Sequence, residues 1–256
     1  MSPQPSNSLP DSTEAIQAMS VADWQTLLNG DPEKARQWVL AAARMGHSQA
    51  QTVLGQWLLD GHGGLRDAAQ ALQWFLKAAA QSDAMACNMA GRCYENAWGT
   101  DAQPLKAVAL YEQAAALGLD AGMYNLANQL AAGTGIAQDH HRALTLYSQA
   151  ARLGHVKSLN KAGNYLEDGT AVEKNLPMAQ SFYQLAAEGG DFRGQFSYAR
   201  LLAEQGRHDE ALRWLQKVTE TATPAYRAEA GKLLQASPLP AFREIGVAMS
   251  RGTGPA

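Results

Sequence analysis

The chain has 256 residues, of which 46% are hydrophobic, and a formal net charge of −3. This charge gives no general affinity for a phosphate backbone, so no nucleic-acid partner is expected. No segment approaches the roughly 18 consecutive apolar residues of a membrane span, so no membrane partner is expected, and residues 1–20 lack the basic and apolar regions of a signal peptide. The two cysteines, Cys87 and Cys93, would point to different faces of one helix and lie too far apart to form a disulfide. Two free thiols in a cysteine-poor chain predict a cytoplasmic location.

Residues 1–12 are the first segment along the chain. They are rich in Ser, Pro and Asn and contain almost nothing that could be buried. We therefore expect a disordered N-terminal tail.

An Ala-Ala pair recurs every 36 residues and marks one helix of each repeat. Its five copies are Ala42-Ala43, Ala78-Ala79, Ala114-Ala115, Ala150-Ala151 and Ala186-Ala187. Four residues before the second Ala stands a larger residue: Val39, Phe75, Tyr111, Tyr147 and Tyr183. Because positions four apart share one face of a helix, these residues predict a packing face with an aromatic knob beside small alanines.

Residues typical of helix ends bracket these helices. An Asp or Asn stands at the expected N-cap in four copies, and in the remaining copy Gln103 precedes Pro104, where a missing N–H costs nothing. A Gly follows the helix end in four copies, but Ser82 replaces it in the second, so we expect that turn to be less well terminated. These second helices of the pairs are predicted at roughly 32–45, 68–81, 104–117, 140–153 and 176–188.

The first helices of the pairs lie between them and carry a small residue at their middle: Gly55, Gly91, Ala127 and Gly163. Gly inside a helix costs about 1 kcal/mol relative to Ala. Its repetition in register predicts helix–helix contacts too close for a β-carbon. Gly-x-Gly segments such as Gly61 to Gly63 predict the loops that join the two helices of a pair.

Both ends of the repeat array depart from this pattern, as expected for capping repeats. Residues 14–28 lack the Leu-Gly and Gly-x-Gly signatures, and Pro224 begins a further helix. In the C-terminal tail, residues 238–256, the apolar residues Phe242, Ile245 and Met249 fall at helical spacing. They predict a short amphipathic helix that either packs on the last repeat or acts as a docking motif, for a partner or for the protein's own groove.

The combined pattern, A-x-x-x-L-G-x-x-Y-x-x-G-x-G followed by D-x-x-K-A-x-x-W/F-Y-x-K-A-A-x-x-G, resembles the Sel-one-like repeat (SLR), a longer-looped relative of the tetratricopeptide repeat. The resemblance covers about residues 14–222. It implies an all-α fold, a right-handed α-α superhelix (solenoid) of helix-pair repeats with capping helices. The repeat domain is expected over residues 13–237, with about six helix pairs at roughly 14–46, 47–82, 83–118, 119–154, 155–190 and 191–222 and a cap helix at 224–236.

The sequence contains no recognisable catalytic or metal-binding constellation. Its six histidines show no HExxH or comparable ligand spacing, and neither a CxxC nor a G-x-S-x-G element occurs. Gly133-Thr134-Gly135 lacks the Gly-Lys-Ser/Thr of a phosphate loop and fits an inter-helix loop instead. We therefore predict no metal, no cofactor and no enzymatic activity, and interpret the cysteines as buried structural thiols.

In the tetratricopeptide class the first helices line the concave face, so the resemblance implies a groove on these helices. Two rows of non-consensus positions, four residues apart, fall on one face there. The first row is Gln56, Arg92, Asn128, Asn164 and Arg200. The second row is Thr52, Asn88, Tyr124, Asn160 and Phe196. Asn can pair with the C=O and N–H of an extended peptide, and Arg can hold a carboxylate bidentately.

The alternative interpretation is that these are ordinary solvated residues. Acidic neighbours on the same face, Asp60, Glu95, Glu167, Asp168 and Glu204, also allow a ligand with basic character. The leading hypothesis is a monomeric adaptor or scaffold that binds another protein or a peptide. The alternative is a bacterial immunity protein that neutralises a cognate toxin, and an enzyme is a distant third.

Overall fold

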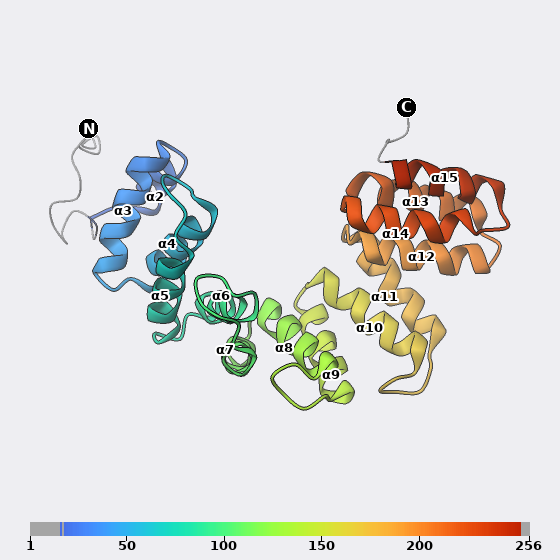
Figure 1. The fold of residues 1–256 in the computed structure, drawn as a ribbon, viewed down its shortest axis with the longest axis horizontal. Coiled ribbons are helices and arrows are strands. Elements are labelled where there is room, and N and C mark those ends of the chain that lie inside the picture. Colours follow the sequence, from blue (N-terminus) through green and yellow to red (C-terminus); the bar gives the residue numbers. More distant parts are fainter. Residues whose placement is uncertain (1–15, 17, 252–256) are drawn as a thin grey trace. The chain divides into compact units, whose positions relative to one another are not determined.

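A computed structural model describes residue 16 and residues 18–251, so the predicted tail at 1–12 and the last five residues of the chain lie outside the described part. Within the described part the fold is all-α, with fourteen helices, α2 to α15, and no strand (Figure 1). The described part forms two compact units, one that ends at Gln138 and one that begins at Asp139. Their boundary falls between the two helices of the predicted pair 119–154.

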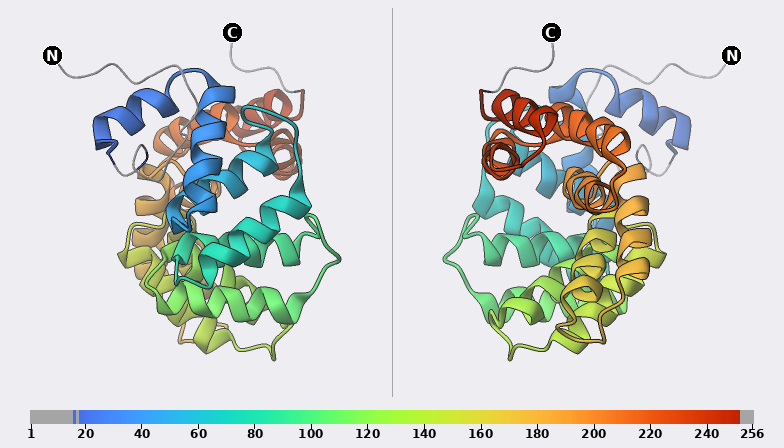
Figure 2. Two further views of the ribbon diagram at one scale, coloured as in Figure 1. Left: turned by 90° about the vertical axis from the view of Figure 1, so that its left-hand side faces the viewer. Right: turned by 90° about the vertical axis from the view of Figure 1, so that its right-hand side faces the viewer.

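The first unit is a series of helices in which each packs on the next along the chain (Figures 1 and 2). Its helices are α2 (Val21–Leu28), α3 (Pro32–Arg44), α4 (Ser48–Asp60), α5 (Ala68–Ala79), α6 (Ala84–Glu95), α7 (Pro104–Ala116) and α8 (Asp120–Ala132). First helices also contact each other directly, as α6 contacts α8. The predicted helix-pair architecture is therefore confirmed in this unit.

The second unit repeats this arrangement and adds a cap. Its helices are α9 (His140–Arg152), α10 (Val156–Asp168), α11 (Leu176–Glu188), α12 (Phe192–Glu204), α13 (His208–Thr221), α14 (Pro224–Gln235) and α15 (Pro240–Arg251). The amphipathic C-terminal helix is α15, which packs on α13 and α14. Phe242 and Met249 are buried in the core of the unit, and Ile245 packs against it. Of the two interpretations of this segment, packing on the end of the array is the one observed.

The second helices begin at the predicted residues because their N-caps work as expected. The side chains of Asp31, Asp67, Asp139 and Asn175 each accept a hydrogen bond from the backbone N–H three residues later. Gln103 makes no such bond, and Pro104 occupies the first turn. The observed helix ends differ from the predicted ones by at most two residues.

Ser82 occupies the turn that was expected to be poorly terminated. It adopts a φ of 62°, in the left-handed region where the other copies have Gly. Its N–H bonds to the Ala79 carbonyl and the next N–H bonds to the Ala78 carbonyl, the same bonds that close the turn at Gly46. The turn is therefore complete. Its backbone at Ser82 is strained, because a residue with a β-carbon rarely adopts this conformation.

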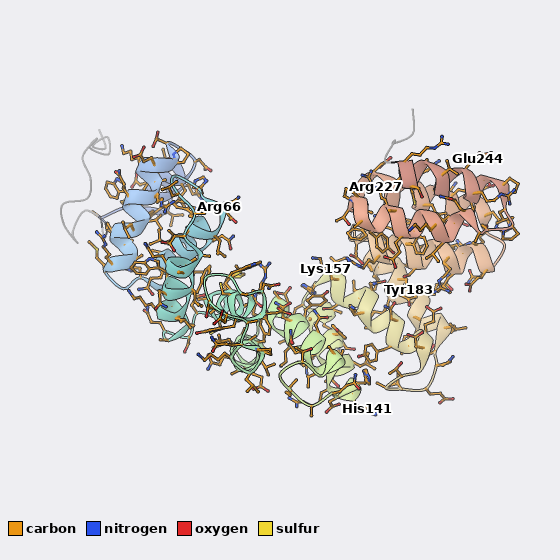
Figure 3. The ribbon with its side chains drawn as sticks, in the orientation of Figure 1. Arg66, His141, Lys157, Tyr183, Arg227 and Glu244 are labelled. Atoms are coloured by element: carbon orange, nitrogen blue, oxygen red, sulfur yellow. The ribbon has the colours of Figure 1, made fainter. Side chains whose placement is uncertain are left out.

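The glycines in the middle of the first helices make the close contacts that their repetition predicts. A β-carbon on Gly91 would lie 2.6 Å from Cε1 of Tyr111, and one on Gly163 would lie 2.6 Å from Cε1 of Tyr183. Both tyrosine side chains are fully buried, and Tyr183 is labelled in Figure 3. The rings of Tyr111 and Tyr183 thus lie against the backbone of the first helix of their own pair.

The Gly-x-Gly loops have a structural role. Gly135, with a φ of 70°, lies against the backbone of Pro104 at the start of α7, where a β-carbon would clash. Gly63 lies in the same way against Pro32 at the start of α3. These loops therefore hold successive repeats together, as the interpretation of Gly133-Thr134-Gly135 as an inter-helix loop requires.

Candidate functional site

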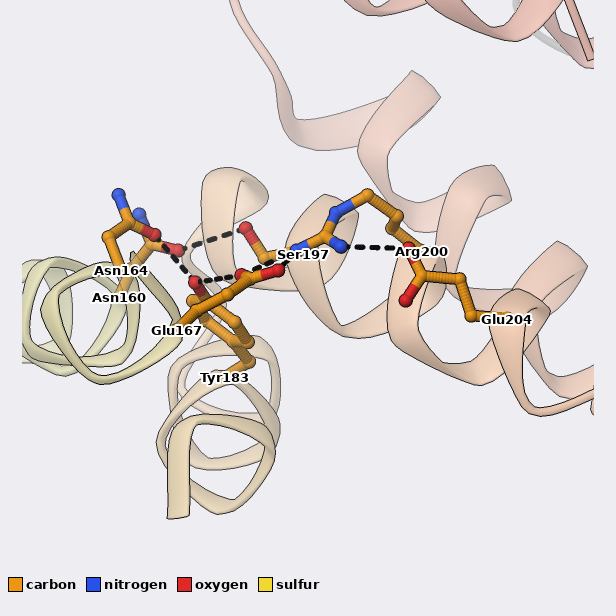
Figure 4. Close-up of polar contacts among 7 residues, drawn as sticks. All are labelled: Asn160, Asn164, Glu167, Tyr183, Ser197, Arg200 and Glu204. Atoms are coloured by element: carbon orange, nitrogen blue, oxygen red, sulfur yellow. Dashed lines mark hydrogen bonds and ion pairs between the residues drawn. The ribbon is translucent and has the colours of Figure 1, made fainter. Parts of the chain in front are cut away.

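Two Asn side chains that were predicted to face a ligand are buried between neighbouring first helices. Asn88 on α6 is 4% exposed, and Nδ2 of Asn125 on α8 donates to its Oδ1 at 2.7 Å. Asn160 on α10 is 5% exposed, and the hydroxyl of Ser197 on α12 donates to its Oδ1 at 3.3 Å (Figure 4). In both cases the donor lies 37 residues later. These amides join adjacent repeats, and their burial removes them from the surface that a ligand can reach.

A polar network centred on Glu167 links three helices of the second unit (Figure 4). Nη2 of Arg200, on α12, lies 2.7 and 2.6 Å from the two carboxylate oxygens of Glu167, on α10. The hydroxyl of Tyr183, on α11, lies 2.8 Å from Oε2 of Glu167 and 2.8 Å from Oδ1 of Asn164. Nη1 of Arg200 also pairs with Glu204 at 2.9 Å. Two residues predicted to bind a partner, Asn164 and Arg200, are thus brought together around one carboxylate.

The network sets the protonation states of its members. Burial alone would raise the pKa of Glu167, but the hydrogen bonds from Arg200 and Tyr183 outweigh it and hold the pKa below its usual range. Burial, and then the hydrogen bond to Glu167, raise the pKa of Tyr183. Burial would lower the pKa of Arg200, but Glu167 and Glu204 raise it. At neutral pH the carboxylate of Glu167 and the guanidinium of Arg200 are therefore charged, and the phenol of Tyr183 is neutral.

The same repeat position in the first unit carries a related network. The hydroxyl of Tyr111, on α7, donates to Oε2 of Glu95 at 2.5 Å, and Nε2 of Gln129, on α8, donates to Oε1 at 2.6 Å. Glu95 lies 72 residues, two repeats, before Glu167. The sequence predicted both carboxylates only as acidic neighbours of the two groove rows on the same helix face, whereas each one ties a second helix to the next first helix. The signal for this role was their fixed spacing of 16 residues before a Tyr.

Arg92 is three repeats before Arg200 but has different surroundings. Its Nη1 lies 3.5 Å from the sulfur of Met89, and its guanidinium lies 5.0 Å from the ring centroid of Trp98. Among the described residues, no ion pair involves it. Arg92 lines an open cavity of about 280 Å³ together with Gln56 and Asp60, whose side chains hydrogen-bond to each other at 2.7 Å.

The remaining predicted positions are half-buried. Tyr124 and Asn128 lie on α8. Phe196, on α12, packs edge-to-face against Tyr226 with ring centroids 6.1 Å apart. The structure thus places Gln56, Arg92, Tyr124 and Asn128 at the surface of the first unit. It places Asn164, Phe196 and Arg200 at the surface of the second.

The second unit has its own open polar cavity at the repeat position of the Arg92 cavity. It has a volume of about 650 Å³, and its charged lining residues are Glu167, Asp168, Lys174, Arg200 and Glu204. The two cavities correspond because Arg200 and Asp168 stand 108 residues, three repeats, after Arg92 and Asp60. Each unit therefore presents an arginine beside a cavity at the end of a first helix.

Over residue 16 and residues 18–251, no group of three or more His, Cys, Asp or Glu side chains could hold a metal ion. Cys87 and Cys93 are both buried and unbonded to each other. Burial raises the pKa of Cys93 to about 11, so its thiol is protonated at neutral pH.

Packed helix pairs with a 36-residue period define an α-solenoid repeat protein. A family model described as the Sel1 repeat matches residues 27–47, 48–83, 84–119, 120–155 and 156–191. The chain therefore belongs to the Sel1 repeat family, which confirms the resemblance found in the sequence. Membership suggests a protein–protein interaction scaffold. A search of curated proteins found no match.

Solved structures share the fold. A protective antigen of uropathogenic Escherichia coli with an SLR fold is 26% identical, with a TM-score of 0.74 over 93% of this chain and 52% of the antigen. This chain thus spans about half the length of that protein. A Sel1 repeat protein from Oxalobacter formigenes is 21% identical, with a TM-score of 0.78 over 91% of this chain and 99% of that one. An immunity protein from Pseudomonas aeruginosa is 17% identical, with a TM-score of 0.54 over 80% of each chain.

None of the helices in the described part is both long enough and apolar enough to cross a bilayer.

Proposed function

We propose that this chain is a non-enzymatic, monomeric, cytoplasmic scaffold or adaptor that binds a peptide or protein segment through the exposed side of its first helices. One observation carries the proposal. In each unit an arginine at the same repeat position, Arg92 or Arg200, stands beside an open polar cavity. Neither arginine is part of the core, which is built from the buried alanines and aromatic rings of the repeat.

The two arginines would contribute differently to binding. Arg92 has no acidic partner among the described residues, so its guanidinium can donate hydrogen bonds to a carboxylate of a ligand. The amide of Gln56 lines the same cavity and offers a further donor or acceptor. Arg200 is already paired with two glutamates. Its role is to fix the position of these carboxylates, which then face the cavity.

Affinity purification followed by mass spectrometry tests this proposal. The tagged wild type is compared with the double variant Gln56→Ala/Arg92→Ala, which alters the cavity of the first unit. The control is Gln37→Ala/Arg44→Ala, which removes the same residue types from exposed positions on the second helix α3. We expect the variant at the cavity to lose proteins that the wild type and the control both retain. Identical sets of captured proteins for all three would contradict the proposal.

The immunity hypothesis remains the second candidate, because a solved structure of this fold is described as an immunity protein. An immunity protein would hold a folded toxin domain, whereas an adaptor would hold a segment. Synthetic peptides that together cover the sequence of a captured partner distinguish these roles. Competition by one peptide supports the adaptor, and competition only by the folded domain supports the immunity protein.

A further inference from the structure

The second unit has an apolar cavity that lies outside the repeat pattern. It has a volume of about 490 Å³ and lies among α12, α13, α14, α15 and the segment that joins the last two. Its apolar lining includes Phe196, Ala203, Leu233 and Leu239. Leu233 is 62% exposed although it is a large apolar residue. This surface exists only because α14 and α15 cap the array, so no repeat position predicted it.

The apolar cavity adjoins the polar cavity of the same unit, because Arg200 and Glu204 line both. The polar cavity has three carboxylates, on Glu167, Asp168 and Glu204, against two cations, on Lys174 and Arg200. Three negative and two positive charges leave an excess of one negative charge. Arg200 forms ion pairs with Glu167 and Glu204 but not with Asp168. The exposed side chain of Asp168 therefore adds a further negative charge at the rim of the polar cavity.

We propose that these two adjoining cavities bind one short segment of a partner protein. The segment places a bulky apolar side chain in the apolar cavity and a Lys or Arg side chain in the acidic one. The inference rests on the proposed scaffold function and names the chemistry of its ligand in the second unit. Charge complementarity selects a basic segment, because an acidic one would bring like charges toward Asp168 and Glu204.

The apolar contact and the charge contact with the ligand can be tested separately, because each involves an exposed residue that lies outside the core. The side chain of Leu233 is exposed and would be covered by the apolar group of the ligand. The side chain of Glu204 is 59% exposed, and its loss leaves Arg200 paired with Glu167. Substitutions at these two positions should therefore change binding and leave the fold intact.

The experiment uses a random dodecapeptide phage library as the probe against the full chain. We expect the wild type to select peptides with an apolar residue next to Lys or Arg. A fluorescein-labelled synthetic copy of the strongest peptide is then titrated by fluorescence anisotropy. Leu233→Glu and Glu204→Lys should each weaken its binding at least tenfold. The controls are Leu185→Glu and Glu188→Lys, both at exposed positions on α11 away from the cavities, and should stay within twofold of the wild type.

The outcomes separate this inference from the proposed function. Selection of acidic peptides, or of peptides whose binding is insensitive to Leu233→Glu and Glu204→Lys but lost in Gln56→Ala/Arg92→Ala, would overturn the inference and leave the scaffold function standing. Binding that tightens tenfold when residues 252–256 are deleted would assign the cavity to the chain's own end and would also overturn it. Failure to select any peptide, together with no protein captured by the wild type, would count against both.

Discussion

Nη2 of Arg200 lies 2.6 Å from Oε2 of Glu167, although the two residues are 33 positions apart in the sequence. The pair joins the first helices of two consecutive repeats, α10 and α12. Tyr183 reaches the same carboxylate from the second helix between them. One glutamate therefore holds three successive helices of the second unit and fixes the charge that faces the polar cavity.

Glu167→Gln should destabilise the protein. The substitution keeps the size of the side chain but removes the charge that Arg200 faces, and the loss of a partly buried charged hydrogen bond costs about 1–2 kcal/mol. The measurement is the urea unfolding midpoint followed by circular dichroism. Glu188→Gln, an exposed residue on α11, is the matched control and should shift the free energy of unfolding by less than about 0.5 kcal/mol. Equal midpoints for both variants would contradict the role of Glu167.

The contribution of Glu167 should also depend on pH. Its pKa in the folded protein lies below the ordinary value of 4.5, so its stabilising effect is complete above that value and is lost as the pH falls through the folded pKa. The wild type should exceed Glu167→Gln in stability at neutral pH, and the difference should shrink below about pH 4.5. Burial raises the pKa of Asp191, but both proteins contain this residue, so the difference isolates Glu167. A difference that is constant from pH 7 to pH 3 would refute the assignment.

Gly91→Ala should be destabilising even though Ala is the better helix former. The new methyl group would meet the buried ring of Tyr111, and overpacking of this kind costs about 1–3 kcal/mol. This exceeds the gain in helix propensity of about 1 kcal/mol over most of that range. Thermal unfolding of Gly91→Ala and of the equivalent Gly55→Ala, which would meet Phe75, tests the packing. A higher melting temperature in either variant would show that the backbones can separate without loss.

Ser82→Gly should be stabilising. Relief of the left-handed strain stabilises the folded state by about 1–2 kcal/mol. The greater conformational entropy of the unfolded chain with Gly reduces this gain by about 0.4–1 kcal/mol. We therefore expect a net gain of about 0–1.6 kcal/mol in the free energy of unfolding, with a central value of about 0.8 kcal/mol. The reverse change, Gly118→Ser at a φ of 85°, should lose stability. Urea unfolding of both variants checks the prediction, and changes of the same sign would be inconsistent with it.

The 36-residue period determines much of the fold because each repeated residue has a local task. Asp139 caps its own helix and Gly163 accommodates Tyr183 of its own pair. These contacts need only the spacing along one or two helices. The helix positions and the close contacts could therefore be predicted from the sequence alone.

The partners of the polar side chains could not be predicted in the same way. The period shows that Asn88 and Asn160 occupy one repeat position. It does not show that the next first helix crosses close enough for Asn125 and Ser197 to reach them. That contact depends on how two first helices pack.

The apolar cavity of the second unit was missed for a related reason. It is lined by Leu233 and Leu239 from segments with no repeat equivalent. Only the packing of α15 on α13 and α14 brings them to the end of α12.

We expect the partner to bind to the exposed side of the first helices. Isothermal titration calorimetry of a purified captured partner tests it most directly, with the wild type, Gln56→Ala/Arg92→Ala and the control Gln37→Ala/Arg44→Ala. We expect the Kd to rise at least tenfold for the first variant and to stay within twofold of the wild type for the control. An unchanged Kd for Gln56→Ala/Arg92→Ala, with weaker binding by the control, would place the binding surface on the second helices and refute the proposal.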